Sequence, residues 1–195
     1  MRNLNEIVDN LGGIYESQPS KIKSSDIEQF EENNFFKLPK DYKDFLLEYG
    51  YCLFNECISF IPINEDAIYQ HESSSGRANY WFKGSQLSCF YGIDTGLDHD
   101  TNELIYNLNT YKSRIPTGFF PIANDGLGNQ ICLSLNTKDY GCIYWWDHEN
   151  EWDEDDFFEE TRTRMPDEVK YQNIYLIAKS FTDFLLKLEV QDDEY

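Results

Sequence analysis

Histidines flanked by carboxylates are the residues of this sequence whose types could do chemistry. His99 lies in the triplet Asp98–Asp100, His148 lies in the triplet Asp147–Glu149, and His71 is the third histidine. Such groups bind a divalent metal if the fold brings the two triplets together. No H-E-x-x-H spacing places two ligands on one element, so two polar turns are the favoured interpretation. We therefore expect no metal, no cofactor and no catalytic residue, and a metal-dependent enzyme remains the unfavoured alternative.

Motifs for nucleophilic catalysis and phosphate binding are also missing. A Ser or Cys nucleophile needs a base beside it, and no G-x-S-x-G motif is present. The segment ANDGLGNQ lacks the carboxylate spacing of a calcium loop and the Lys-Ser/Thr of a phosphate loop. Gly126 and Gly128 instead predict a hairpin turn. Five scattered cysteines without zinc-type spacing predict buried, reduced thiols in a cytoplasmic protein.

Negative charge is the strongest feature of the composition. Sixteen Lys and Arg against 36 Asp and Glu give a formal net charge of −20, and residues 147–160 hold nine acids without Lys or Arg. Such a chain repels nucleic acid and anionic membranes, so we expect neither as a partner. Docking of a basic protein would relieve the self-repulsion of this segment. The candidate partner-binding residues are Asp147, Glu149, Glu151, Trp152, Asp153, Glu154, Asp155, Asp156, Phe157 and Trp81.

The aromatic residues near this segment have two interpretations. Large rings dominate binding hot spots, which makes Trp152, Phe157 and Trp81 candidate anchors for a partner. Alternatively, the rings belong to the core and the acids form a solvated face. Strand alternation predicts that one of Trp145 and Trp146 points inward and the other outward. The sequence leaves both interpretations open.

The elements that must position these residues begin with helices and continue with strands. Apolar residues at helical spacing predict one helix before Gly12, a second from about Ser25, and a third that starts at Pro39 and ends at Gly50. Strand-like runs follow at 57–63 and 87–93. Residues 71–84 between them read as a loop, and residues 102–112 fit a short helix or a strand equally well. Three strands joined by tight turns within 118–146 predict an antiparallel meander.

The C-terminal region completes an α+β pattern. Apolar residues at i, i+3, i+4 and i+7 between Ile174 and Leu188 predict an amphipathic helix of about five turns. N-terminal helices and a long C-terminal helix would then pack on a mostly antiparallel sheet. We expect a single domain over residues 1–195, with an acidic insertion at about 149–166. No apolar run approaches the ~20 residues of a membrane helix, and the polar N-terminus does not predict a secretory signal.

The order and spacing of several segments resemble a known family. These segments are LPKDYKDFLLEYG, FFPIANDGLGNQICLSL, GCIYWWDHE and IAKSFTDFLLKL, and the similarity spans about Ser25 to Leu188. Together they are similar to the SUKH superfamily, the Smi/Knr-like domain. The shared motifs carry no catalytic constellation and map to residues of the fold, namely Pro39, Tyr42, Phe45, Gly126, Gly128 and Phe181. The acidic insertion after Trp146 departs from the family pattern.

The resemblance implies a binding function rather than an enzymatic one. Bacterial members typically neutralise a cognate polymorphic toxin, often a nuclease, by binding it, whereas fungal members regulate cell-wall synthesis. The expectation is therefore a bacterial, cytoplasmic immunity protein (an antitoxin) whose partner is a toxin with a basic surface. A regulatory or scaffold module that binds a basic protein other than a toxin is the alternative.

Overall fold

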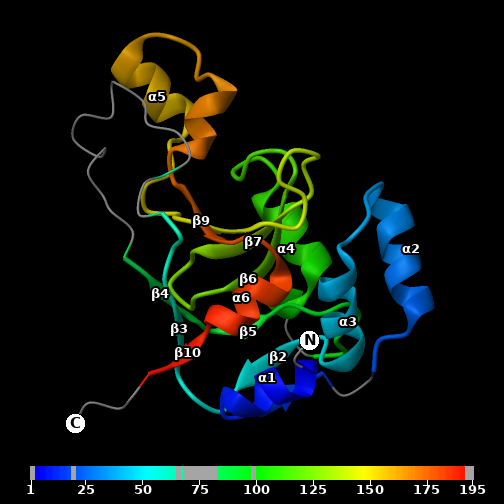
Figure 1. The fold of residues 1–195 in the computed structure, drawn as a ribbon. Helices are drawn as coiled ribbons and strands as arrows, with labels where there is room; N and C mark the ends of the chain where they lie inside the picture. The colour runs from blue at the N-terminus through cyan, green and yellow to red at the C-terminus, as the bar shows by residue number, and fades with distance from the viewer. Residues whose placement is uncertain (1–2, 19–20, 65–66, 68–82, 98–99, 192–195) are drawn as a thin grey trace.

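Antiparallel strands form the centre of the molecule, and helices surround them (Figure 1). The computed structural model describes residues 3–18, 21–64, 67, 83–97 and 100–191. The expected α+β class and mostly antiparallel sheet are confirmed. Trp81, His71 and His99, together with most of the predicted loop at 71–84, lie outside the described residues.

Seven strands form the main sheet in the order β1-β2-β5-β6-β7-β8-β9, and every adjacent pair is antiparallel. A second, three-stranded sheet has the order β10-β3-β4. The predicted meander at 118–146 corresponds to β6, β7 and β8 and is confirmed. The strands are β1 (Ile14–Ser17), β2 (Cys52–Phe54), β3 (Ile58–Phe60), β4 (Ser85–Leu87), β5 (Cys89–Phe90), β6 (Phe119–Asn124), β7 (Gln130–Ser134), β8 (Ile143–Trp146), β9 (Ile174–Ala178) and β10 (Glu189–Val190).

The three predicted N-terminal helices are present, and residues 102–112 contain a helix rather than a strand. Gly50 follows the third helix with φ of 59°, the left-handed conformation predicted for it. None of the described helices is long and apolar enough to cross a bilayer. The helices are α1 (Leu4–Asn10), α2 (Ser24–Asn34), α3 (Lys40–Glu48), α4 (Leu104–Tyr111), α5 (Glu154–Thr161) and α6 (Phe181–Lys187), with 3-10 turns η2 (Asp100–Asn102) and η3 (Asp167–Tyr171).

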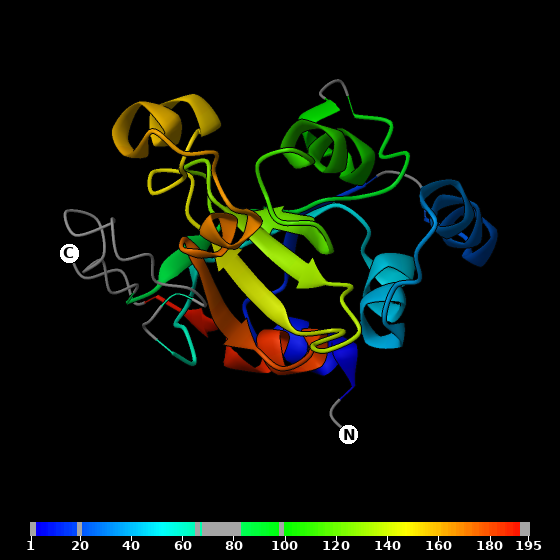
Figure 2. The same cartoon turned by 90° about the horizontal axis from the view of Figure 1, so that it is seen from above.

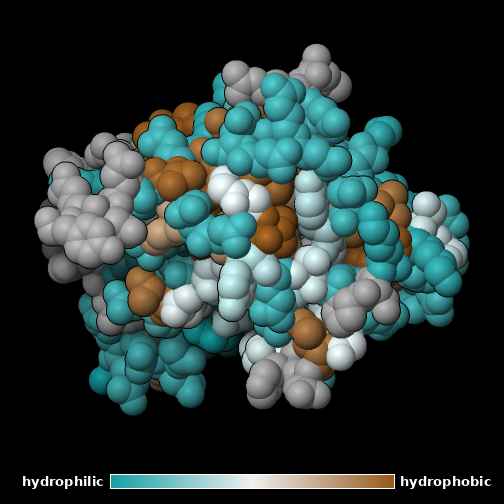
Figure 3. Space-filling view, turned by 90° about the horizontal axis from the view of Figure 1, so that it is seen from below, coloured by the Kyte–Doolittle hydropathy of each residue, from teal (hydrophilic) through white to brown (hydrophobic). Residues whose placement is uncertain are grey.

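Both faces of the main sheet are covered by apolar side chains. The larger cluster includes Phe45 of α3, Phe90 of β5 and Phe181 of α6, whose rings lie within 4.6–5.7 Å of one another. A smaller cluster on the other face contains Phe119 and Trp146. Viewed from above, α4 and α5 lie apart from α6 and α1 on either side of the sheet (Figure 2). On the face seen from below, hydrophobic residues form separate patches among hydrophilic ones (Figure 3).

The two adjacent tryptophans show how a strand serves both clusters. Trp145 belongs to the larger cluster and Trp146 to the smaller one, so they point to opposite faces as predicted. Neither ring is exposed to solvent, since both residues are buried. The second face is covered by α4 and by the segment that follows it, which supply Tyr111 and Ile115.

The long C-terminal helix is the main error of the sequence prediction. Residues Ile174–Ala178 form β9, which pairs with β8, and only Phe181–Lys187 is helical. The strand is buried on both faces and therefore reads as a continuous apolar run, in which helical and strand spacing coincide. Ser180 marks the true start of the helix, because its side chain accepts a hydrogen bond from the N–H of Asp183 at 3.0 Å.

Candidate protein-binding site: the acidic lobe

Residues 147–171, between β8 and β9, form a projection that we call the acidic lobe. It contains α5 and η3 and extends away from the sheet, as the gold and orange segment at the top of Figure 1 shows. Its two ends meet at neighbouring strands, since Trp146 and Ile174 are paired residues of β8 and β9. The lobe is therefore a long connection between two neighbouring strands. Polar contacts at its base fix its position relative to the sheet.

The base of the lobe is fixed by Asp147 and Asn173. The N–H of Asp147 donates to the carbonyl of Asn173 at 2.9 Å, and the Asn173 side chain donates to the carbonyl of Asp147 at 2.6 Å. The buried Asp147 carboxylate accepts from the N–H of Glu149 at 3.0 Å and from the Asn150 side chain at 2.5 Å. Burial raises the pKa of Asp147, although these hydrogen bonds act in the opposite direction. The Asp147 carboxylate thus forms hydrogen bonds within the protein and does not face a partner.

The hairpin turn between β6 and β7 holds the next residue of the lobe. Asn129 Oδ1 accepts from the N–H of His148 at 3.0 Å and lies 2.7 Å from its Nδ1. Asp125 orders the turn, since its carboxylate accepts from the N–H of Leu127 and from the side chain of Asn129. Gly128 has φ of 101°, and a Cβ there would lie 3.0 Å from the His148 ring. The turn predicted from ANDGLGNQ therefore supports the lobe.

A bidentate ion pair joins the lobe to the end of α4. The Arg114 guanidinium donates to Glu151 at 2.6–3.1 Å and lies over the rings of Tyr111 and Trp146. The hydrogen bonds to Glu151 raise the pKa of Arg114. Lys170 donates to the carbonyl of Ser113 at 2.9 Å and gives a second contact between the same two regions.

A small core lies inside the lobe. It consists of Trp152, Phe157, Met165 and Val169, and the two rings meet edge to face with centroids 5.5 Å apart. Trp152 is 7% exposed and Phe157 is 1% exposed. These two candidate anchors therefore stabilise the lobe in this conformation rather than offer a ring to a partner. Phe158, which the sequence analysis did not single out, is 52% exposed beside them.

Helix α5 presents the acids. Asp153 caps its first turn, because its side chain accepts from the N–H groups of Asp155 at 2.8 Å and of Asp156 at 3.4 Å. Acids near a helix N-terminus also interact favourably with the helix dipole. The helix ends at Arg162 in a left-handed conformation, with φ of 59°.

The nine acids of the segment fall into two groups. Asp147 is buried and Glu151 is half-buried in its ion pair, so both serve the fold. The other seven are exposed, and no ion pair among the described residues involves them. They form an anionic surface on a folded support. These seven are Glu149, Asp153, Glu154, Asp155, Asp156, Glu159 and Glu160.

A metal site is not assembled from the part of the chain that the structure describes. No three His, Cys, Asp or Glu side chains gather there in an arrangement able to hold an ion. His148 faces the hairpin turn through Asn129, and His99 of the first triplet lies outside the described residues.

Comparisons with known proteins find similar sequences. A family model of the SUKH group, described as SMI1-KNR4 cell-wall, matches residues 24–161. The chain is also 32% identical over 171 residues to the SPbeta prophage-derived uncharacterized protein YokK of Bacillus subtilis (strain 168). That match covers 87% of this chain and 76% of the relative.

Proposed function

Because the chain belongs to the SMI1-KNR4 family, we propose that it is an immunity protein that binds a cognate toxin through the acidic lobe. The family is not known for enzymes, and it occurs in immunity-like contexts. The prophage-derived relative is described as uncharacterized, so the family and the charge of the lobe carry the proposal. The toxin in this proposal has a basic surface, and a nuclease fits it because a site that binds phosphate is basic.

The observation that carries the proposal is the set of seven exposed carboxylates on a lobe anchored at its base. Like charges held this close repel one another, and a cationic partner removes that repulsion. The hydrogen bonds of Asp147 and the ion pair of Glu151 fix the orientation of the lobe before binding. Carboxylates that are already oriented lose little conformational entropy on binding, so the surface is suited to fill a basic cleft in place of nucleic acid.

Electrostatic attraction of this kind acts mainly on the rate of association. Steered encounters raise the association rate constant from about 10⁵–10⁶ towards 10⁸–10⁹ M⁻¹s⁻¹ at low salt. A toxin must be neutralised before it acts, so a fast encounter matters more than a slow and tight one. The partner-binding residues of the proposal are therefore the exposed acids first, with Trp152 and Phe157 supporting them from inside.

The test uses the protein encoded by the gene adjacent to that of this chain. Co-expression with the parent chain is expected to restore growth to cells in which the adjacent gene product is toxic. The key variant reverses Glu154, Asp156, Glu159 and Glu160 to Lys and leaves the cap residue Asp153 in place. We expect its association to slow by roughly tenfold or more at low salt and to lose most of its salt dependence.

A matched control carries the same change in net charge at the other end of the molecule. Glu6, Asp9, Glu16 and Glu56 are exposed, and they belong to α1, β1 and the turn after β2, at the end of the molecule opposite α5 in Figure 1. Reversal of these four acids to Lys makes the net charge less negative by the same amount but leaves the lobe intact. Equal slowing by both variants would mean that net charge, and not the lobe, drives association, and would remove the lobe from the mechanism.

The cell-wall description of the family favours a second candidate, a regulatory module that binds a basic protein of its own cell. The two candidates differ in the growth experiment. If the adjacent gene product is not toxic and yet binds the parent chain with a salt-dependent rate, the regulatory module replaces the immunity protein.

A further inference from the structure

Phe35 is an exposed aromatic residue in an unusual backbone conformation. It ends α2 with φ of 58° and is 95% exposed. A bulky residue in the left-handed region is rare, and glycine is the common residue at this place after a helix. The conformation costs free energy, and the exposed ring recovers almost none of it by packing. An exposed ring in such a conformation is better explained by contact with a binding partner than by a contribution to the stability of the fold.

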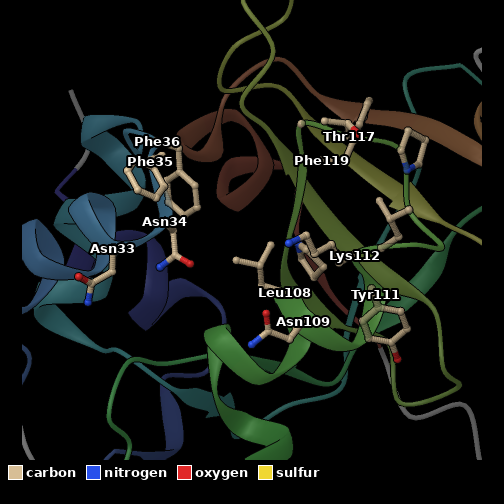
Figure 4. A pocket seen from close by; sticks show the side chains of 14 residues that line it. Asn33, Asn34, Phe35, Phe36, Leu108, Asn109, Tyr111, Lys112, Thr117 and Phe119 are labelled. Atoms are coloured by element: carbon tan, nitrogen blue, oxygen red, sulfur yellow. The ribbon is translucent and has the colours of Figure 1, made fainter.

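Phe35 lies at the rim of a groove between α2 and α4. Phe36 beside it packs inward against Phe120, with ring centroids 5.2 Å apart, and so fixes the rim. In Figure 4, the end of α2 lies on one side of the groove, across from Leu108, Asn109 and Lys112. The groove has a volume of about 440 Å³. Its other lining residues include Tyr111, Ile115, Pro116, Thr117, Phe119 and Pro121.

The charge of the groove differs from that of the rest of the molecule. Among the described residues that line the groove there is no Asp or Glu, and Lys112 is the one ionised side chain. Its other polar side chains include the amides of Asn33, Asn34 and Asn109. Apolar walls with amide groups suit an uncharged segment that carries an apolar side chain. A second copy of this chain is disfavoured as the occupant, because two molecules with a formal net charge of −20 repel each other.

The groove adjoins the acidic lobe through residues 111–115. Tyr111, Lys112 and Ile115 line the groove. The residues between them contact the lobe, through the ion pair of Arg114 with Glu151 and the bond from Lys170 to the carbonyl of Ser113. One short segment, residues 111–115, therefore contacts both the groove and the lobe, so a partner that covers this segment reaches both.

We propose that this groove, with Phe35 at its rim, binds an uncharged segment of the same basic partner that the acidic lobe attracts. The inference rests on the proposed function and assigns separate kinetic roles to the lobe and the groove. The lobe sets the rate of association, and the groove sets the rate of dissociation, because apolar contacts excluded from water determine how long a complex lasts. The occupant presents an apolar side chain to Phe35, Leu108 and Phe36.

The test is the substitution Phe35→Asn, measured with the purified product of the adjacent gene. Asparagine tolerates the left-handed conformation, so the variant is expected to fold as stably as the parent. We expect the complex to dissociate roughly tenfold faster or more, with the association rate and its salt dependence unchanged. Asn109→Glu, which places a carboxylate in the groove, is expected to act in the same direction. Ile61→Ser is the matched control, because Ile61 is exposed beside β3, far from α2 in Figures 1 and 2.

The outcomes separate the groove from the lobe. If lobe reversal slows association while Phe35→Asn and Asn109→Glu leave dissociation within twofold of the parent, the groove inference is overturned and the proposed function stands. If the parent forms no complex, both are overturned. Hydrogen exchange of the parent complex provides an independent readout, with protection expected for the amides of 33–36 and 108–119. Equal exchange there in the free and bound protein contradicts the groove as a contact.

Discussion

Two buried phenylalanines show how differently the body of the protein and its acidic lobe are stabilised. Phe90, on the interior strand β5, has the rings of Phe45, Phe54, Phe181 and Phe184 within 6.4 Å. Phe157 is equally buried but belongs to a cluster of four residues. The body is therefore stabilised by apolar packing, whereas the lobe depends on a small core and on polar contacts at its base. A lobe of this kind can open without unfolding the sheet.

The largest effect is expected at the centre of the body. Phe90→Ala removes a fully buried ring from between strand and helices, and the free energy of unfolding should fall by about 3–5 kcal/mol. Denaturant unfolding monitored by tryptophan fluorescence measures this loss. A loss below about 1 kcal/mol would contradict the view that this cluster is the main source of stability.

The same substitution in the lobe should have a smaller and more local effect. Phe157→Ala removes a ring of the same size, but the loss of stability is limited by the free energy that holds the lobe closed, which for a subglobal unit is smaller than the free energy of global unfolding. Hydrogen exchange should accelerate in residues 150–170 and stay unchanged in β6, β7 and β8. Faster exchange in the meander would mean that the two regions unfold together, which would contradict independent opening of the lobe.

The two regions also differ in how much of them could be predicted from the sequence. The meander was predictable, because its strands and turns are local patterns, as were the exposed acids of residues 153–160. The division of the aromatic residues was not predictable, since only the tertiary structure decides that Trp152 is inward and Phe158 outward. The groove was invisible for the same reason, because its walls come from segments about 75 residues apart in the chain.

Sequence patterns also gave a wrong secondary structure where the spacing of apolar residues fits both a helix and a strand. The run IYLIA (Ile174–Ala178) was predicted as the start of a long helix, and it is a strand buried on both faces. The β-branched and aromatic residues of this run favour a strand, but their spacing also fits a helix. Left-handed Phe35 is the opposite case, since no sequence rule predicts a phenylalanine where glycine is usual.

Acid should affect the two regions in opposite ways. Burial raises the pKa of Glu31 in α2, but hydrogen bonds from Lys37, the N–H of Leu38 and Lys43 outweigh it, so its pKa is lowered. A carboxylate with a lowered folded-state pKa contributes stability above the unfolded value of 4.5, and this is lost as the pH falls through the folded value. The pKa of Asp147 is raised, so its ionisation opposes folding as the pH rises above 3.8.

The pH experiment compares the parent with Glu31→Gln. At pH 7 we expect the variant to be less stable by about 2 kcal/mol, because charge-assisted hydrogen bonds are lost from a buried position. The difference should shrink as the pH falls below 4.5, which thermal unfolding between pH 3 and 7 measures. A difference that stays constant over this range would mean that the lost stability comes from packing and not from ionisation of Glu31.

The smallest effect is expected at the ion pair that joins the two regions. Arg114 and Glu151 are partly exposed, so solvent screens their attraction, and a double-mutant cycle of Arg114→Met and Glu151→Gln should give a coupling of about 1 kcal/mol or less. The effect on the lobe should exceed the effect on the body, because the pair fixes the orientation of the lobe against α4. Hydrogen exchange in the single variants should therefore accelerate in residues 150–170 at nearly constant melting temperature. The Lys40–Asp44 pair is the matched control, since both partners lie on the exposed face of α3 and their removal leaves the lobe unaffected. An equal coupling at both pairs, with no change in lobe exchange, would show that the ion pair does not hold the lobe in place.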